Sequence, residues 1–221
     1  MLEKLYDSRF ELFLSSQVAI LFGSLIMPAA LFETVLDPIL FLINLLAGIL
    51  LISKKPRLMW FCVGVLGLSA IVFIVSTLLG KASKELGFLR LGGYFLFYLV
   101  VSFEIIRQVW YAKRVNKNVI FGLVSGFISL GLIGFFICMS IEMSTPNSFQ
   151  GAFLGMPERP ELVAEQLMYF SFITLMTIGY GDIIPITSLA QKAALLIGLI
   201  GNFYLVIITA VVIGKFINQS K

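Results

Sequence analysis

Long apolar segments separated by short charged ones dominate the pattern of this chain. Four uncharged apolar segments lie at residues 12–32, 58–80, 119–141 and 193–214, and about 20 apolar residues suffice for a helix to span a bilayer. Two candidates are weaker, because residues 38–52 form a short segment and residues 91–112 contain Glu104 and Arg107. The pattern predicts an all-α membrane protein with six transmembrane helices.

Composition supports a membrane protein and narrows the chemistry. The 221 residues are 59% hydrophobic and 13% charged, whereas a soluble domain carries about 25% charged residues. A cleaved signal peptide is the alternative for the first segment, but the apolar core of such a peptide is about 7–15 residues long. The chain contains no histidine, which excludes histidine triads and histidine metal sites. No span carries two aspartates or a deep lysine, so we expect no enzyme and no cofactor.

The distribution of basic residues predicts the orientation. With the N-terminus inside, ten Lys and Arg residues fall in cytoplasmic segments and five fall outside, as the positive-inside rule requires. Six spans then place both termini in the cytoplasm, in a multi-pass protein of the cell (plasma) membrane. The net charge of +4 follows from this topology and calls for no nucleic-acid partner.

A charged segment at residues 113–118 (KRVNKN) divides the chain into two predicted domains. Residues 1–116 form a four-span N-terminal membrane domain. In residues 117–221, a span is followed by a polar loop, a short helix-like stretch at 162–176 and a last span. The short stretch cannot cross a bilayer and leads directly into the sequence TIGYGD. Non-helical backbone at membrane depth is tolerated only where it is buried or lines a cavity, so we predict a re-entrant helix followed by a backbone-lined cavity.

The glycines of TIGYGD suggest what this backbone does. Glycine adopts backbone angles closed to other residues, and alternating such residues with ordinary ones turns successive carbonyl groups in one direction. Stacked carbonyl oxygens replace the hydration shell of a hard cation. Ile178 and Tyr180 are expected to point outward and to pack the segment in place. Since one strand cannot surround an ion, the hypothesis requires several copies, which we expect as a homotetramer.

The segment TIGYGD resembles the selectivity filter of potassium channels, whose usual form is TVGYGD, and the resemblance extends from about Tyr169 to Gly201. It implies that residues 117–221 form a pore domain with an outer helix, turret, pore helix, selectivity-filter loop and inner helix. It also implies an acidic ring formed by Asp182 at the outer mouth. The K+ ligands implied by the resemblance are the oxygens of Thr177, Ile178, Gly179, Tyr180 and Gly181.

The same resemblance suggests residues for the cavity and the gate. Gly201 lies 20 residues beyond Gly181, where many members of the family have a hinge, although Gly198 is a competing candidate. Asn202 follows the hinge, and Thr209 lies about two helical turns further on the same face. Met176 replaces a usual threonine and is expected at the inner cavity entrance.

These observations predict a potassium-selective ion channel that passes dehydrated K+ and is not strongly voltage-gated, because the fourth span lacks periodic arginines. The alternatives are a weakly selective cation channel and a subunit of a potassium uptake system. Glu104 and Arg107, three residues apart, are expected to pair as a structural ion pair. The expected partners are K+, membrane lipid and further copies of the chain, while the gating stimulus stays open.

Overall fold

The computed structural model of the protein describes residues 6, 8–26, 32, 36–79, 84–152 and 160–219. Among these residues, three helical stretches are long and apolar enough to cross a membrane, namely Leu86–Tyr111, Lys117–Ser144 and Ser188–Gln219. Shorter apolar helices lie at Ile39–Ile52, Pro56–Val72 and Leu162–Leu175. The predominantly helical architecture of a membrane protein agrees with the sequence pattern, and the number of six spans stays a prediction.

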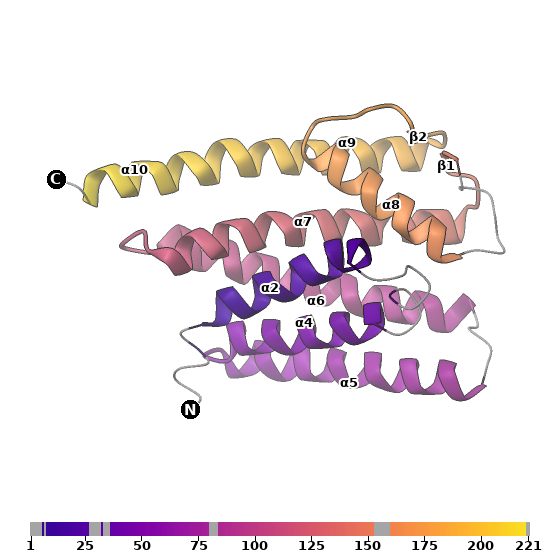
Figure 1. Ribbon diagram of the computed structural model, residues 1–221, viewed down its shortest axis with the longest axis horizontal. Helices are drawn as coiled ribbons and strands as arrows, with labels where there is room; N and C mark the ends of the chain where they lie inside the picture. Colours follow the sequence, from indigo (N-terminus) through magenta and orange to yellow (C-terminus); the bar gives the residue numbers. More distant parts are fainter. Residues whose placement is uncertain are drawn as a thin grey trace. The chain divides into compact units, whose positions relative to one another are not determined.

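The elements follow one another along the chain as Figure 1 shows. They are α2 (Arg9–Phe22), η1 (Gly23–Leu25), α4 (Asp37–Ile52), α5 (Pro56–Leu79), α6 (Lys84–Tyr111), α7 (Lys117–Ser144), β1 (Phe149–Gln150), α8 (Pro160–Leu175), β2 (Ile184–Pro185), α9 (Ser188–Phe203), η3 (Tyr204–Ile208) and α10 (Thr209–Gln219). The ends of two predicted spans, at residues 27–31 and 80, lie outside the described residues.

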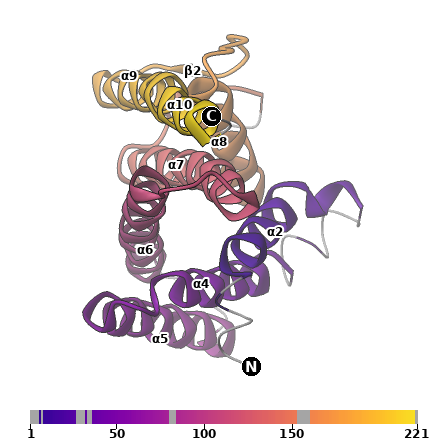
Figure 2. The same ribbon diagram turned by 90° about the vertical axis from the view of Figure 1, so that its left-hand side faces the viewer.

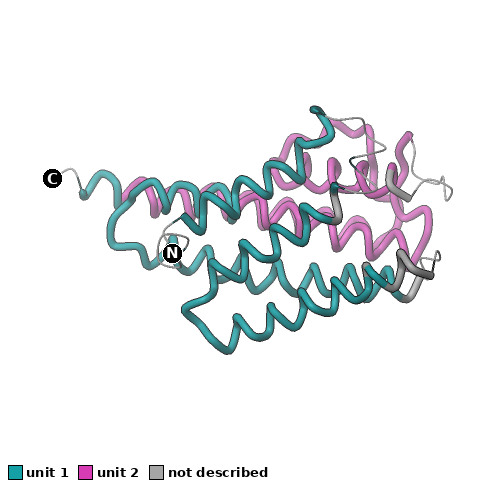
Figure 3. The backbone as a smooth tube through the Cα atoms, turned by 60° about the horizontal axis from the view of Figure 1, so that its bottom comes forward, with its two compact units in different colours: residues 1–126, 215–221 teal, residues 127–214 magenta. Residues whose placement is uncertain are grey.

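The chain divides into two compact units, coloured separately in Figure 3. Unit 1 comprises Met1–Gly126 and Lys215–Lys221, and unit 2 comprises Phe127–Gly214. The limits of these units differ from the predicted domain limits at residues 116 and 117, since part of α7 and the end of α10 belong to unit 1. The two domains, as functional divisions, stay a prediction.

Unit 1 is a bundle of antiparallel helices with an apolar core. Helix α4 lies between α2 and α5 (Figure 2), and α6 packs against both α4 and α5. Because α4 is apolar all round, it can be buried on several faces at once. The fully buried side chains include Phe13, Leu45, Leu51, Phe97 and Ile105.

A buried polar cluster joins three helices of this bundle. The Tyr98 hydroxyl on α6 donates to Asn44 Oδ1 on α4 at 2.6 Å. Asn44 Nδ2 donates to Ser16 Oγ on α2 at 2.8 Å and to the Phe13 carbonyl at 3.3 Å. Such interhelical hydrogen bonds hold membrane helices together where no hydrophobic driving force acts between them.

Unit 2 brings α7, α8 and α9 together through small residues. A Cβ atom at Gly131 of α7 would lie 2.4 Å from the ring of Phe172, and one at Gly134 would lie 2.3 Å from Ser171 Oγ. Ser171 Oγ in turn donates to the Gly131 carbonyl at 2.7 Å. The two glycines therefore allow α8 to approach α7 closely, as small residues do between membrane helices.

Candidate functional site

Helix α8 directly precedes the candidate site at residues 176–182. It begins at Pro160, and proline suits the first helical position because its missing N–H would have no intrahelical partner there. The helix ends at Leu175, close to the predicted end at residue 176. The Met176 N–H still bonds to the Phe172 carbonyl at 2.9 Å, and the backbone then leaves the helical path. Met176 itself is exposed, with 40% of its surface accessible.

The backbone after α8 alternates in conformation over residues 177–181. Positive φ angles occur at Thr177 (58°), Gly179 (58°) and Gly181 (82°), whereas the residues between them have ordinary negative values. The left-handed region suits glycine but is rare for a β-branched residue such as threonine. Strained conformations of this kind are held in place by surrounding structure and gather at functional sites. The alternation is the pattern that was expected to turn successive carbonyl groups in one direction.

Hydrogen bonds anchor the start of this segment to the end of α8. The Thr177 N–H donates to the Thr174 carbonyl at 3.0 Å, and the Ile178 N–H donates to the Ile173 carbonyl at 2.9 Å. The Gly179 N–H also points toward the Ile173 carbonyl, at 3.4 Å. The Ile173 carbonyl thus accepts from two consecutive amides and compensates for the positive φ angle at Thr177.

The carbonyl oxygens of residues 177–181 are available to a ligand. Within the described ranges, none of them accepts a hydrogen bond from a protein group, and all five residues are exposed in the single chain. Buried backbone carbonyl groups nearly always have a partner in a folded protein. These five residues are exposed, so in the single chain their oxygens are open to water or to a bound ion.

The expected packing of Ile178 and Tyr180 is not formed within one chain. Their exposed fractions are 46% and 72%, so neither side chain is covered by the described residues of its own subunit. The prediction that both side chains point outward and pack the segment in place is therefore not met by contacts within one chain, and it stays a prediction for an assembly of several chains.

Asp182, at the end of the segment, is exposed and has a hydrogen-bond partner on α8. The side chains of Tyr169 and Asp182 are hydrogen-bonded. The pair links the segment after the glycines to α8, and no sequence signal identified it beforehand.

Glu142 organises the turn that precedes α8, and the sequence analysis did not single it out. Its carboxylate accepts hydrogen bonds from three consecutive backbone amides, those of Asn147 at 2.7 Å, Ser148 at 2.9 Å and Phe149 at 3.2 Å. Asn147 has a φ of 64°. A carboxylate is a strong acceptor for such convergent N–H groups, so Glu142 stabilises a turn that includes a left-handed residue.

This turn reaches the segment that follows Asp182. Strand β1 pairs antiparallel with β2, so that Phe149 lies opposite Pro185 and Gln150 lies opposite Ile184. The Ser148 carbonyl also accepts from the Ile186 N–H at 2.8 Å. Glu142 therefore positions, through the β1–β2 pair, the chain that leaves the candidate site.

We expect Glu142→Gln to lower the free energy of unfolding by about 2 kcal/mol, because the amide would turn a donor toward three donating N–H groups. The measurement is thermal unfolding of the purified protein in detergent. Glu165→Gln is the matched control, since Glu165 on α8 is exposed. Equal stability of the two variants would contradict the assigned role of Glu142.

The candidate hinge glycines lie against the end of α8. A Cβ atom at Gly201 would lie 2.0 Å from the Leu175 carbonyl oxygen, and one at Gly198 would lie 3.8 Å from the Thr174 carbonyl oxygen. Gly201 is buried. A glycine is thus required at this position for close packing of α9 on α8. This requirement explains the glycine without any bending of the helix.

A departure from α-helical geometry occurs just after these glycines. Residues Tyr204–Ile208 form a π-helical segment between α9 and α10, and such segments often mark functional positions in helices. Asn202 is exposed and Thr209 is half-buried. The prediction that these two residues share a face assumed an uninterrupted α-helix. The π-helical segment between them has a different number of residues per turn, so α-helical spacing does not apply across it.

Comparison with known proteins adds one finding. Residues 150–218 match a family model described as "Ion channel", and this range includes α8, the segment 176–182, α9 and most of α10. The chain matches no curated protein and no solved structure. The match at residues 150–218 supports an ion channel function for a membrane protein and suggests a function other than catalysis.

Proposed function

We propose that the chain is one subunit of a homotetrameric channel that conducts K+ selectively through the backbone of residues 177–181. The observation that carries the proposal is the alternation of φ angles over Thr177, Gly179 and Gly181, together with carbonyl oxygens that have no protein partner among the described residues. Carbonyl oxygens that replace an ion's water molecules are the ligands of a potassium filter.

The exposed side chains of the segment favour several subunits around one axis. A single chain supplies oxygens from one side only and leaves Tyr180 72% exposed. Large exposed apolar surfaces in a folded protein mark contact sites. In the proposed tetramer, Ile178 and Tyr180 pack against neighbouring subunits and hold the filter open at the diameter of a dehydrated K+ ion.

The remaining assignments follow the same proposal. Asp182 forms an acidic ring at the outer mouth, where it raises the local concentration of cations. Met176, Asn202 and Thr209 line the cavity on the cytoplasmic side of the filter, and Gly201 with the π-helical segment Tyr204–Ile208 permits the inner helix to move. The chain lies in the cell membrane with both termini in the cytoplasm.

Weak voltage dependence is part of the proposal. Steep voltage dependence requires several charges that move through the membrane field. In α6, the Glu104 carboxylate is buried and pairs with Lys55 and, at 3.8 Å, with Arg107. The predicted Glu104–Arg107 pair is thus formed, and a paired charge of this kind stabilises the bundle instead of moving freely.

The experiment is a reversal-potential measurement in a planar bilayer with K+ on one side and Na+ on the other. We expect reversal close to the potassium equilibrium limit, because Na+ is poorly coordinated by a ring of carbonyl oxygens spaced for K+. Reversal near zero with sustained current would favour the weakly selective cation channel. Native mass measurement of the assembly serves as the control, since a single-subunit particle would favour a subunit of an uptake system.

A further inference from the structure

A basic pocket lies in unit 1. This cavity of about 730 Å³ is lined by the start of α2, the α4–α5 connection and the α6–α7 connection. Among the described residues, five cationic side chains and one carboxylate line it, which together carry a net charge of +4. The cations are Arg9, Lys54, Lys55, Lys113 and Arg114, and the carboxylate is Glu104.

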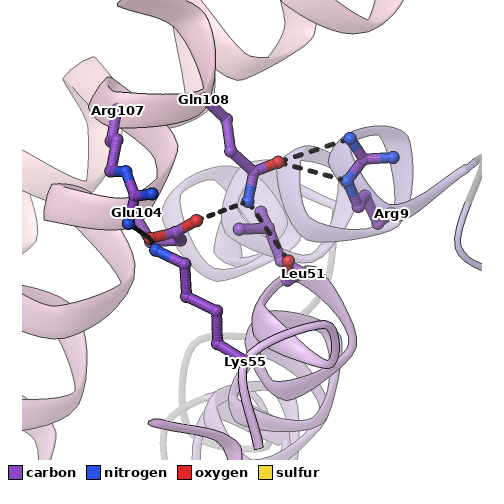
Figure 4. A network of polar contacts seen from close by, with 6 residues as sticks. All are labelled: Arg9, Leu51, Lys55, Glu104, Arg107 and Gln108. Carbon is purple, nitrogen blue, oxygen red and sulfur yellow. Dashed lines mark hydrogen bonds and ion pairs between the residues drawn. The ribbon is translucent and has the colours of Figure 1, made fainter. Parts of the chain in front are cut away.

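The one carboxylate of the basic pocket is already neutralised by its neighbours. Glu104 pairs with Lys55 and Arg107 and accepts a hydrogen bond from Gln108 Nε2 at 3.2 Å, as Figure 4 shows. Glu104 is buried, so these contacts are the ones that balance its negative charge. It therefore forms no ion pair with the exposed cations Lys54, Lys113 and Arg114 of the lining.

Arg9 is held in a fixed position on the wall of the pocket. Its Nε and Nη2 atoms donate to Gln108 Oε1 at 3.4 and 3.3 Å (Figure 4), and its Nη1 atom donates to the Tyr6 carbonyl at 2.9 Å. The guanidinium group also stacks over the ring of Tyr6, at 4.0 Å from the centroid. A pre-positioned guanidinium loses little conformational entropy when an anion binds.

Three further cations of the pocket lack an acidic partner. Lys54, Lys113 and Arg114 are exposed, and no carboxylate of a described residue forms an ion pair with them. The Lys54 ammonium lies 4.2 Å from the centroid of the Tyr6 ring. The positive-inside rule accounts for an excess of basic residues on this side, but it does not account for a hollow into which they converge.

A second cavity of about 540 Å³ shares Lys113 and Arg114 with the basic pocket and adds Lys215, Asn218 and Gln219 of the last helix. Lys215 Nζ donates to the carbonyls of Val109 and Trp110 at the end of α6, where a cation satisfies unpaired helix carbonyls. Gln219 bonds to both the N–H and the carbonyl of Val115. These hydrogen bonds hold the end of α10 beside Lys113 and Arg114.

From this arrangement we propose that the basic pocket binds a phosphate-bearing anion, with Arg114 as a forked donor, Lys54 and Lys113 as point charges, and the fixed Arg9 adding its positive charge from the wall. Phosphate oxygens accept charge-assisted hydrogen bonds from several cations at once, and arginine matches their geometry. The phosphate can come from the headgroup of an anionic lipid or from a soluble phosphate compound. Both sources present the same chemistry, and the experiment distinguishes them.

The test uses the full chain purified in a neutral detergent and two probes. Native mass spectrometry counts the phosphatidylglycerol molecules retained per subunit, with phosphatidylcholine as the neutral reference, and titration calorimetry measures the binding of inorganic pyrophosphate. The variant Lys113→Gln/Arg114→Gln removes two exposed cations of the pocket. Arg57→Gln/Lys192→Gln is the matched control, because it removes the same charge from exposed residues outside the lining.

We expect Lys113→Gln/Arg114→Gln to weaken binding roughly 30-fold for whichever of the two probes the unmodified chain binds, as the loss of two basic contacts implies. The control variant should bind that probe as the unmodified chain does. Retention of phosphatidylglycerol without pyrophosphate binding identifies a lipid headgroup as the ligand, and pyrophosphate binding identifies a soluble phosphate. Absence of binding by both probes, or an equal loss in both variants, would overturn the proposal.

Binding at this pocket has a consequence for conduction that rests on the proposed function. An anion held by Lys113 and Arg114 lies beside Lys215, so it strengthens the attachment of the α10 end to the α6–α7 connection. The binding assay requires no ion current. A failure of the channel proposal would therefore leave the binding result intact, and a failure of binding would leave the reversal potential unaffected.

Discussion

Gly179→Ala is expected to abolish potassium-selective conduction, with the reversal potential moving from the potassium limit toward zero or the current disappearing. Gly179 has a φ of 58°, and a Cβ atom there would have no neighbour within 4 Å. The cost is therefore conformational, about 1–2 kcal/mol for each L-residue in the left-handed region. In a tetramer this cost applies four times, about 4–8 kcal/mol in all, so the peptide is expected to turn its carbonyl away from the axis.

The measurement is the same bi-ionic reversal potential in planar bilayers. Gly67→Ala is the matched control, because a Cβ atom at Gly67 of α5 also meets nothing within 4 Å and the residue has no positive φ. Alanine is favoured over glycine within a helix, so the control should conduct normally. An unchanged reversal potential in Gly179→Ala would contradict the link between the positive φ angle and the direction of the carbonyl.

Gly201→Ala is expected to destabilise unit 2 by about 3 kcal/mol, the upper end of the usual cost of overpacking, because the atoms that it meets belong to the backbone. The new methyl group would lie 2.0 Å from the Leu175 carbonyl oxygen and 2.8 Å from the carbonyl carbon. Both are backbone atoms at the end of α8, two residues before Thr177. Helix α9 must therefore move away from α8, and the segment 177–181 loses its support. The measurement is the thermal unfolding midpoint, followed by the yield of the assembled particle.

Gly198→Ala provides the control for this variant. A Cβ atom at Gly198 lies 3.8 Å from the Thr174 carbonyl oxygen, which is an ordinary contact, so stability should be retained. The pair also separates two roles of Gly201. If Gly201→Ala were fully stable and altered only the opening of the channel, the residue would be a hinge, and the packing role found in the structure would be wrong.

Part of the site could be recognised from local sequence. The apolar stretch at 162–176 predicted a short helix, and α8 occupies Pro160–Leu175. The glycines of TIGYGD predicted an alternating backbone, and the φ angles at residues 177, 179 and 181 are positive. Thr177 joins this alternation although it is not a glycine, because the hydrogen bonds from Ile178 and Gly179 to the Ile173 carbonyl hold it there.

The contacts between distant residues could not be predicted in the same way. The three amide partners of Glu142 depend on a turn at Asn147, which the local sequence does not predict. Asn44 and Tyr98 lie 54 positions apart in sequence and meet in the core of unit 1. A polar residue inside an apolar segment indicates that a partner exists, but it does not identify which helix carries that partner.

The sequence by itself determined the helical membrane character of the chain, the short helix and the glycine-dependent backbone after it, because each depends on the hydropathy or the permitted dihedral angles of neighbouring residues. Only the tertiary structure decided that Gly201 is needed for packing against Leu175 and that a π-helical segment follows it. It also decided that Lys113 and Arg114 meet Lys54 and Lys215 around shared cavities. These features depend on how helices pack against one another, and the energy of packing is set by residues far apart along the chain.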